Sequence, residues 1–353
     1  MKKHNFSAGP SILPQEVLKK ASEAIIDFNG LGLSLIEISH RSKDFIAVMD
    51  KAQDLVKELL ELPEGYSVLF LQGGASSQFL MTPYNLLKEG GKAVYLDTGA
   101  WSSKAIKEAK NFGETVVIAS SKDKGYNYIP KGYQIPSDAG YMHFTSNNTI
   151  FGTQLKEFPG NDVLKVVDMS SDIFSRKIDF TQFDVVYAGA QKNMGPSGTT
   201  LVIVKDAVFG TSGRSIPSML DYAVHAKAGS MFNTPPVFAV YVSMLTLEWL
   251  KEKGGIEAIE KINNEKAELL YNEIDNNPSF VGFAAKEDRS NMNVTFTLAD
   301  ESKKEKFDKL AAAAGIIGIN GHRSVGGYRA SIYNAMPIES IQVLVNAMQE
   351  LNK

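Results

Sequence analysis

Seven short apolar runs, separated by segments with helical periodicity, constrain the fold of this 353-residue chain more than any other feature. Most of these runs are apolar at successive positions, which is typical of strands that are covered on both faces. Strands that alternate with helical crossovers predict an α/β domain with a mainly parallel, seven-stranded sheet. The runs are Ser67–Leu71, Ala93–Leu96, Thr115–Ala119, Tyr141–Thr145, Val163–Val167, Val185–Ala188 and Thr200–Val204.

The last hundred residues predict a second, smaller unit. Two strands, Met292–Leu298 and Tyr328–Ile332, alternate there with three helical segments, which is an α+β pattern. A chain of this length is also expected to divide into two domains. We therefore predict a large domain over residues 1–253, with the N-terminal segment included, and a small C-terminal domain over residues 254–353.

Residues that can cap helices predict where three of the helices begin. Ser42 precedes an amphipathic stretch and is expected to cap its first turn. Thr234, with Pro235 in the first helical position, is expected to cap a helix that leads out of the large domain. Ser302 and Glu305 form the pattern of a capping box before an alanine-rich helix.

The composition excludes several classes of protein. A formal charge of −3 argues against a general nucleic-acid or membrane surface, so an anionic ligand needs a local basic cluster. The absence of cysteine excludes disulfide bonds, thiolate metal sites and thiol nucleophiles, and it fits a reducing cytoplasm. No apolar stretch approaches the ~20 residues that span a bilayer, and residues 1–6 do not form a secretory signal. We predict no metal site.

A lysine and an aspartate follow two of the predicted buried strands. Lys192 lies in a glycine-dense turn after Val185–Ala188, and Asp168 ends the preceding run. Ligands of parallel sheets bind at the carboxyl ends of the strands, where both side chains would lie. The pair suits pyridoxal phosphate, because the lysine can form a Schiff base and the carboxylate can hold a proton on the pyridine nitrogen. Taken alone, each could instead be an ordinary surface or turn residue.

Two further segments could hold the phosphate and the ring of such a cofactor. The sequence Gln72–Phe79 combines a strand end, two glycines and a helix start, so its backbone N–H groups could bind phosphate. An ordinary tight turn would explain the same pattern. Trp101 follows a strand end and could stack on a planar ring, although a core aromatic is equally consistent. No dinucleotide-binding or Walker pattern follows any strand.

Two compact basic clusters could hold an anionic substrate. His40 and Arg41 precede a helix, while His322, Arg323 and Arg329 lie in or just after a glycine-dense loop. Arginine binds carboxylate and phosphate in a planar, bidentate manner, whereas solvated charge is the usual explanation for a lone arginine. One arginine for an α-carboxylate and a basic set for a second anion would suit an acidic or phosphorylated substrate.

These segments together resemble the phosphoserine aminotransferases, which are fold-type I, class V enzymes that use pyridoxal phosphate. The resemblance covers nearly the whole chain. The segment around Lys192 suits several aminotransferases of this fold type, while Gly321–Met336 is more particular to the family. The other segments that carry the resemblance are Asn5–Pro10, Ser39–Arg41, Asn148–Ile150, Ala190–Asn193 and Asn233–Pro236.

The resemblance implies a role for each candidate residue. Lys192 would form the Schiff base and carry a proton between Cα and C4′, Asp168 would pair with the ring nitrogen, and Arg329 would bind the substrate α-carboxylate. Trp101 would stack on the ring. The other cofactor-binding residues would be Ala75, Ser76, Thr149 and Gln191, with Asn233 and Thr234 from a neighbouring subunit; His40, Arg41, His322 and Arg323 would bind the distal carboxylate or phosphate of the substrate.

The implied reaction is a ping-pong transfer of an amino group from glutamate to 3-phosphohydroxypyruvate in serine biosynthesis, in a homodimer with its active site at the interface. A serine or alanine aminotransferase would not need both basic clusters. A cysteine desulfurase needs a thiol, which this chain lacks. A non-catalytic metabolite-binding protein would leave Lys192 and Asp168 without a role.

Overall fold

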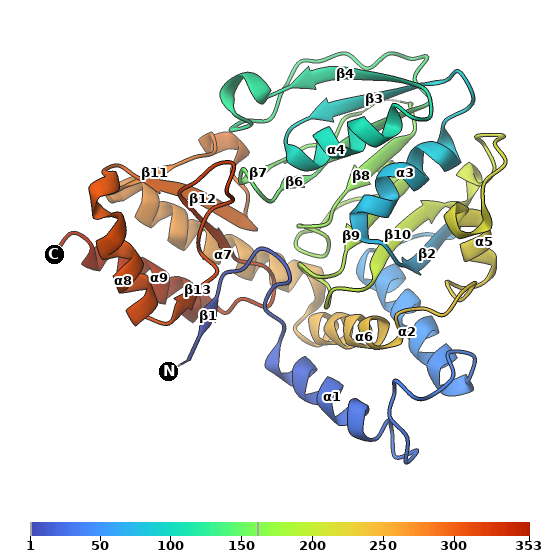
Figure 1. Cartoon of the computed structure of the whole chain (residues 1–353), viewed down its shortest axis with the longest axis horizontal. Helices are drawn as coiled ribbons and strands as arrows, with labels where there is room; N and C mark the ends of the chain where they lie inside the picture. Colours follow the sequence, from blue (N-terminus) through green and yellow to red (C-terminus); the bar gives the residue numbers. More distant parts are fainter. Residues whose placement is uncertain (1, 161) are drawn as a thin grey trace.

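The computed structural model describes residues 2–160 and 162–353 and has the predicted α/β architecture (Figure 1). Its large sheet has seven strands in the order β2–β10–β9–β8–β5–β3–β4. β10 runs antiparallel to β2 and β9, and every other pair of neighbours is parallel, so the predicted sheet is confirmed. The strands are β2 (Tyr66–Leu71), β3 (Lys92–Asp97), β4 (Glu114–Ser120), β5 (Tyr141–Thr145), β8 (Lys165–Asp168), β9 (Val185–Gly189) and β10 (Thr200–Lys205).

Helices cover both faces of this sheet (Figure 1). β5, β8 and β9 are buried along their whole length, as their uninterrupted apolar sequences predict. β4 differs because it lies at the edge, where Val117 is exposed despite a similar sequence. One face packs against α3 (Gly74–Leu86) and α4 (Ala100–Ala109), and the other against α1 (Gln15–Ile26), α2 (Lys43–Leu59) and α6 (Val237–Glu252).

The C-terminal part has its own hydrophobic core around a three-stranded antiparallel sheet. The N-terminal strand β1 (His4–Asn5) pairs with β13 (Ile316–Ile317), and Phe6 is buried in this second core. The division of the chain after residue 253 stays a prediction. The other elements here are β11 (Phe280–Gly282), β12 (Asn293–Leu298), β14 (Tyr328–Ser331), α7 (Gly255–Asn276), α8 (Lys304–Ala313) and α9 (Ile338–Glu350).

One of the three predicted helix caps is correct and two are wrong. The Ser42 side chain accepts a hydrogen bond from the backbone N–H of Phe45, which confirms the cap of α2. Thr234 does not cap α6, because this helix begins only at residue 237: Pro236 disfavours the helical conformation for the residue before it, Pro235. The predicted capping box of Ser302 and Glu305 is also wrong. The carboxylate of Asp300 accepts a hydrogen bond from the Ser302 N–H and caps a short 3₁₀ turn that precedes α8.

Candidate active site

Lys192 lies in the turn after β9, at the carboxyl ends of the parallel strands, and the N-terminal segment packs against this turn. Ser11 donates two hydrogen bonds to it, from its backbone N–H to the Gln191 carbonyl and from its hydroxyl to the Lys192 carbonyl. Gly9 has a φ of +148°, and a Cβ at this position would lie 3.3 Å from Lys192 Cγ. Residues 9–11 therefore contact and hold the lysine turn, although 181 positions separate Ser11 from Lys192 in the sequence.

The Lys192 amine is surrounded by three of the residues that the sequence analysis selected. Its Nζ donates to Thr149 Oγ1 at 2.8 Å and lies 5.6 Å from the centroid of the Trp101 ring. Arg329 Nη1 donates to the Thr149 carbonyl at 3.4 Å. The pKa of Lys192 is lowered to about 8: burial lowers it most, negative Asp168 opposes this change, and positive Arg329 adds to it. The amine is therefore neutral far more often than an exposed lysine at neutral pH.

Asp168 ends β8 and is almost fully buried. One carboxylate oxygen accepts from the Ser170 N–H at 2.9 Å. Burial raises the pKa of Asp168, and the positive charge of Lys192 opposes this rise. A buried carboxylate is costly unless a cation pairs with it.

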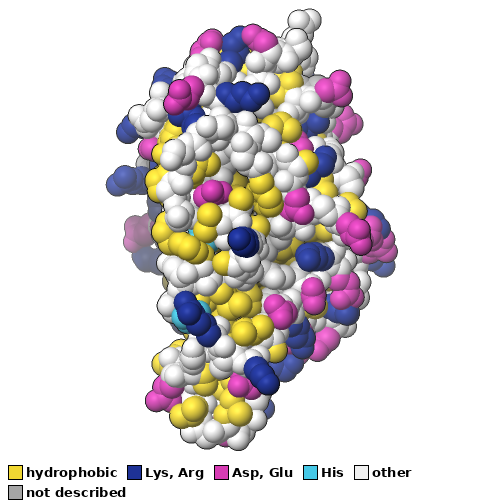
Figure 2. Space-filling model, turned by 90° about the vertical axis from the view of Figure 1, so that its right-hand side faces the viewer, with side chains coloured by type: hydrophobic (Ala, Val, Ile, Leu, Met, Phe, Trp, Pro, Cys, Tyr) yellow, Lys and Arg dark blue, Asp and Glu magenta, His cyan; other side chains and the backbone are white. Residues whose placement is uncertain are grey.

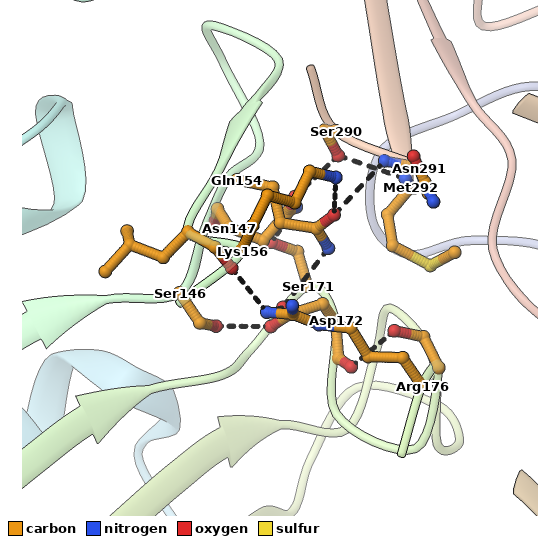
Figure 3. A network of polar contacts seen from close by, with 12 residues as sticks. Ser146, Asn147, Gln154, Lys156, Ser171, Asp172, Arg176, Ser290, Asn291 and Met292 are labelled. Carbon is orange, nitrogen blue, oxygen red and sulfur yellow. Dashed lines mark hydrogen bonds and ion pairs between the residues drawn. The ribbon is translucent and has the colours of Figure 1, made fainter. Parts of the chain in front are cut away.

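A second carboxylate, Asp172, was missed by the sequence analysis, and its negative charge is close enough to raise the pKa of Asp168. Figure 3 shows the polar contacts of Asp172. Ser146 Oγ connects the two residues, since both the backbone carbonyl of Asp168 and Asp172 Oδ1 lie within reach of its single O–H donor. Asp172 Oδ2 also accepts from Arg176 at 3.2 Å and from Gln154 at 3.3 Å. Asp172 thus has its cation within the protein, whereas Asp168 is the carboxylate that remains for a ligand.

Two further polar atoms near Lys192 are buried and have no hydrogen-bond partner among the described residues. They are the ring N–H of Trp101 and Nε of Arg329. Buried polar groups in folded proteins normally have a partner, so these atoms indicate space for a ligand. A lysine with a lowered pKa, a carboxylate without a cation, an aromatic face and an arginine together fit a flat, anionic cofactor with a basic ring nitrogen.

The glycine turn after β2 has the geometry expected of a phosphate-binding site. Gly73 has a φ of +92° and begins α3 without a side-chain cap, so the N–H groups of the first turn, Ala75 and Ser76 among them, have no helical partner. Gln72 Nε2 donates to the Thr234 carbonyl at 2.8 Å, which brings Asn233 and Thr234 beside this turn. Their expected role in a neighbouring subunit stays a prediction.

Within residues 2–160 and 162–353, no hydrogen bond or ion pair joins the two basic clusters. Arg41 is exposed, and in residues 2–160 and 162–353 neither it nor His40 has a contact with Lys192, Asp168 or Arg329. His40 Nε2 is buried but has no partner among the same residues. The second cluster does assemble. Arg329 and Arg323 lie close enough to His322 that their positive charges, together with burial, lower its pKa.

Lys104 is a further basic residue of this second cluster that the sequence analysis missed. Its Nζ lies 4.3 Å from the centroid of the Trp101 ring, and its charge also lowers the pKa of His322. Residues three apart on a helix are neighbours, so its spacing from Trp101 on α4 is the signal that could have identified it.

Comparisons with known proteins support the same assignment. The family model "Aminotransferase class-V" matches residues 3–344. A phosphoserine aminotransferase of Flavobacterium johnsoniae is 68% identical over 352 residues, which are 99% of both chains. The chain belongs to the phosphoserine aminotransferase family of class-V aminotransferases. The predicted family and fold type are confirmed.

Other members of the phosphoserine aminotransferase family agree with this conclusion. The relative from Bacteroides fragilis is 59% identical and covers 100% of this chain and 99% of its own. The solved structure from Bacillus circulans subsp. alkalophilus has a TM-score of 0.96 at 47% identity, with 99% and 98% of the two chains covered. A structure from Trichomonas vaginalis with bound PLP has a TM-score of 0.91 at 34% identity and covers 99% of this chain and 100% of its own. In the described part of this chain, no helix has the length and apolar character needed to cross a membrane.

Proposed function

We propose that the chain transfers the amino group of glutamate to 3-phosphohydroxypyruvate in a ping-pong reaction with pyridoxal phosphate, giving O-phosphoserine and 2-oxoglutarate for serine biosynthesis. The observation that carries this proposal is the pairing of Lys192, whose pKa burial lowers to about 8, with the buried Asp168, whose carboxylate has no ion pair in the described residues. The proposal also rests on 68% sequence identity to a relative that is named phosphoserine aminotransferase.

Each residue around Lys192 has a separate task in this proposal. Pyridoxal phosphate, when bound, supplies an aldehyde that condenses with amines and a ring that accepts electrons from the substrate. With the cofactor bound, Lys192 Nζ would carry the proton between the substrate Cα and C4′, and Thr149 Oγ1 would orient this amine. The Asp168 carboxylate keeps the ring nitrogen protonated, and Trp101 supports the ring and excludes water from one face. Gln191, Ala75 and Ser76 hold the ring oxygen and the phosphate.

The substrates place two further demands on the chain. Glutamate and 3-phosphohydroxypyruvate each carry an α-carboxylate and a distal anion, so one set of basic residues can serve both. Arg329 binds the α-carboxylate, since its guanidinium lies beside Thr149 and has an unpaired Nε. His322 and Arg323, together with His40 and Arg41, bind the distal anion. Because no hydrogen bond or ion pair joins the two basic clusters within the described residues of one chain, we infer that they meet across a dimer interface.

An exposed apolar surface supports a homodimer. Large hydrophobic side chains are exposed at the end of α1, in the loop that follows it and around α5 (Tyr222–Lys227). Figure 2 shows hydrophobic side chains across the face at the right of Figure 1, where α5 lies. Apolar surface of this kind is typical of an interface between proteins. The exposed residues are Ile26 (81%), Ile36 (60%), Leu33 (50%), Met219 (46%), Leu31 (45%), Phe232 (41%) and Phe238 (37%).

The cellular location that fits this function is the cytoplasm. The chain has no cysteine, so its fold needs no oxidising compartment. Cell fractionation with an antibody against the protein tests this location, and recovery in a membrane or extracellular fraction would contradict it.

Borohydride reduction tests the proposed cofactor and its lysine. The purified protein should show a visible absorption band that borohydride removes, with a cofactor mass adduct on Lys192. Lys192→Ala should lack the band, the adduct and transamination. Lys156→Ala is the matched control, because burial also lowers the pKa of Lys156 to about 8 but its amine donates to Gln154 instead.

A substrate comparison tests the proposed specificity. The ratio kcat/KM should be much higher for 3-phosphohydroxypyruvate than for pyruvate as amino acceptor. Equal values would favour a serine or alanine aminotransferase, and a protein with neither band nor turnover would reject transamination altogether.

A further inference from the structure

Three buried asparagines from distant parts of the chain donate hydrogen bonds to three consecutive carbonyl oxygens. The acceptors belong to residues 173–175, in the loop that follows Asp168. This loop is buried, and Phe174 has a φ of +58°, a conformation that non-glycine residues rarely adopt. The pairs are Asn193 with Ile173 at 2.6 Å, Asn334 with Phe174 at 2.8 Å and Asn263 with Ser175 at 3.0 Å.

The three asparagines, which we call the asparagine ladder, are also bonded to one another. The backbone N–H of Asn334 donates to Asn193 Oδ1 at 2.9 Å, and Asn263 Nδ2 donates to Asn334 Oδ1 at 2.8 Å. Asn334, in the middle, therefore uses its backbone N–H, its side-chain nitrogen and its side-chain oxygen. An amide side chain has both donors and an acceptor, which this position requires.

The asparagine ladder joins the three segments that carry the proposed chemistry. Asn193 directly follows Lys192, and the acceptor loop begins at Asp168. Asn334 follows the strand β14, which carries Arg329. The segment before Asn334 is held as well, because Lys266 Nζ donates to the carbonyls of residues 332 and 333 at 2.9 and 2.7 Å.

We propose that Asn334 is a positioning residue that fixes Arg329 relative to Lys192. This inference rests on the proposed function, in which Arg329 binds the α-carboxylate and Lys192 moves the Cα proton. Arg329 lies on β14 of the small sheet and Lys192 in the turn after β9 of the large sheet, so no common strand sets their separation. The asparagine ladder supplies a direct link, and a displacement of about 1 Å at a reacting group costs up to roughly a hundredfold in rate.

The test compares Asn334→Ala with Asn277→Ala in the holoenzyme. Asn277 is a matched control: it is buried, it donates to Met348 O and Glu273, it accepts from Ser279, and it lies in the C-terminal core away from Lys192. Glutarate is the binding probe, because it carries both carboxylates of glutamate but cannot react. Asn334→Ala should raise the Kd for glutarate at least about tenfold and lower kcat/KM for glutamate roughly 10- to 100-fold, with cofactor content unchanged. Asn277→Ala should lower only the Tm.

Two outcomes would overturn the inference. One is an Asn334→Ala enzyme with a lower Tm but unchanged glutarate Kd and kcat/KM. The other is an Asn277→Ala enzyme whose Kd for glutarate rises as much as that of Asn334→Ala. If Asn334→Ala does not fold, Asn193→Ala removes the hydrogen bond between Asn193 and Asn334 from the lysine side. It should raise the Kd for glutarate by a similar factor. A wild-type protein that binds no cofactor would reject the proposed function instead, so the two failures are distinguishable.

Discussion

The ionisation of Lys192 should control how fast the apoenzyme captures pyridoxal phosphate, because only a neutral amine attacks an aldehyde. Burial lowers the pKa of this amine from 10.5 to about 8. At pH 7, a group with a pKa of about 8 is neutral in about one molecule in ten, compared with roughly three in ten thousand at 10.5. Burial therefore raises the reactive population about 300-fold.

Two substitutions should move this ionisation in opposite directions. Positive Arg329 lowers the pKa of Lys192, so Arg329→Met should move the midpoint of the capture rate to higher pH. Negative Asp168 raises the same pKa, so Asp168→Asn should move the midpoint to lower pH. The midpoint is compared rather than the absolute rate, because both substitutions also change the affinity for the cofactor.

Stopped-flow absorbance measures this rate when apoenzyme is mixed with pyridoxal phosphate from about pH 6 to about pH 11.5, a range that contains both the lowered pKa and the pKa of free lysine. The wild-type rate should rise with pH, with its midpoint near pH 8, and level off at higher pH. A midpoint near that of free lysine, or a shift of both variants in the same direction, would refute the assignment of these charges to the Lys192 environment.

Three other perturbations test separate parts of the structure. Burial lowers the pKa of Lys266 to about 7, so between pH 7 and 10.5 the unfolded chain binds a proton there that the folded chain does not, and apoenzyme stability rises with pH. Urea unfolding of Lys266→Met should lack this contribution, which is at most ~1.4 kcal/mol per pH unit. Arg41→Ala should lower kcat/KM for 3-phosphohydroxypyruvate at least about tenfold more than for pyruvate, and equal losses in steady-state assays would point to damaged folding instead. Ile26→Asp combined with Ile36→Asp should convert a dimer to a monomer in light scattering, whereas Val281→Asp, on the C-terminal part and 51% exposed, should not.

The sequence predicted the large sheet because most of its strands are buried on both faces and are therefore apolar at successive positions. The edge strand β4 shares that pattern without the burial, so an apolar run alone does not reveal a strand's place in the sheet. Helix starts were less predictable. Asp300 competes with Ser302 for the same turn, and the choice between two such caps depends on backbone geometry that the sequence does not display.

The selection of Lys192 and Asp168 came from a topological rule, which places ligands at the carboxyl ends of parallel strands. The structure brings both residues together with Thr149, Trp101 and Arg329. The asparagine ladder could not be predicted in the same way, because all but one of its hydrogen bonds join residues 71 to 160 positions apart. An asparagine in a turn or after a strand has many ordinary uses, and only the tertiary fold shows which carbonyl it meets.

A lowered pKa does not by itself distinguish the proposed reactive lysine. Burial lowers the pKa of Lys156, Lys192 and Lys266 to about 8, 8 and 7. The Lys266 amine donates to two backbone carbonyls, of residues 332 and 333. The Lys192 amine donates to one hydroxyl, that of Thr149. Near it lie the ring N–H of Trp101 and Nε of Arg329, which have no hydrogen-bond partner among the described residues. A buried polar atom without a partner costs about 1–3 kcal/mol. Because the surroundings of Lys192 carry two such costs, a ligand that pairs with these atoms gains binding free energy there.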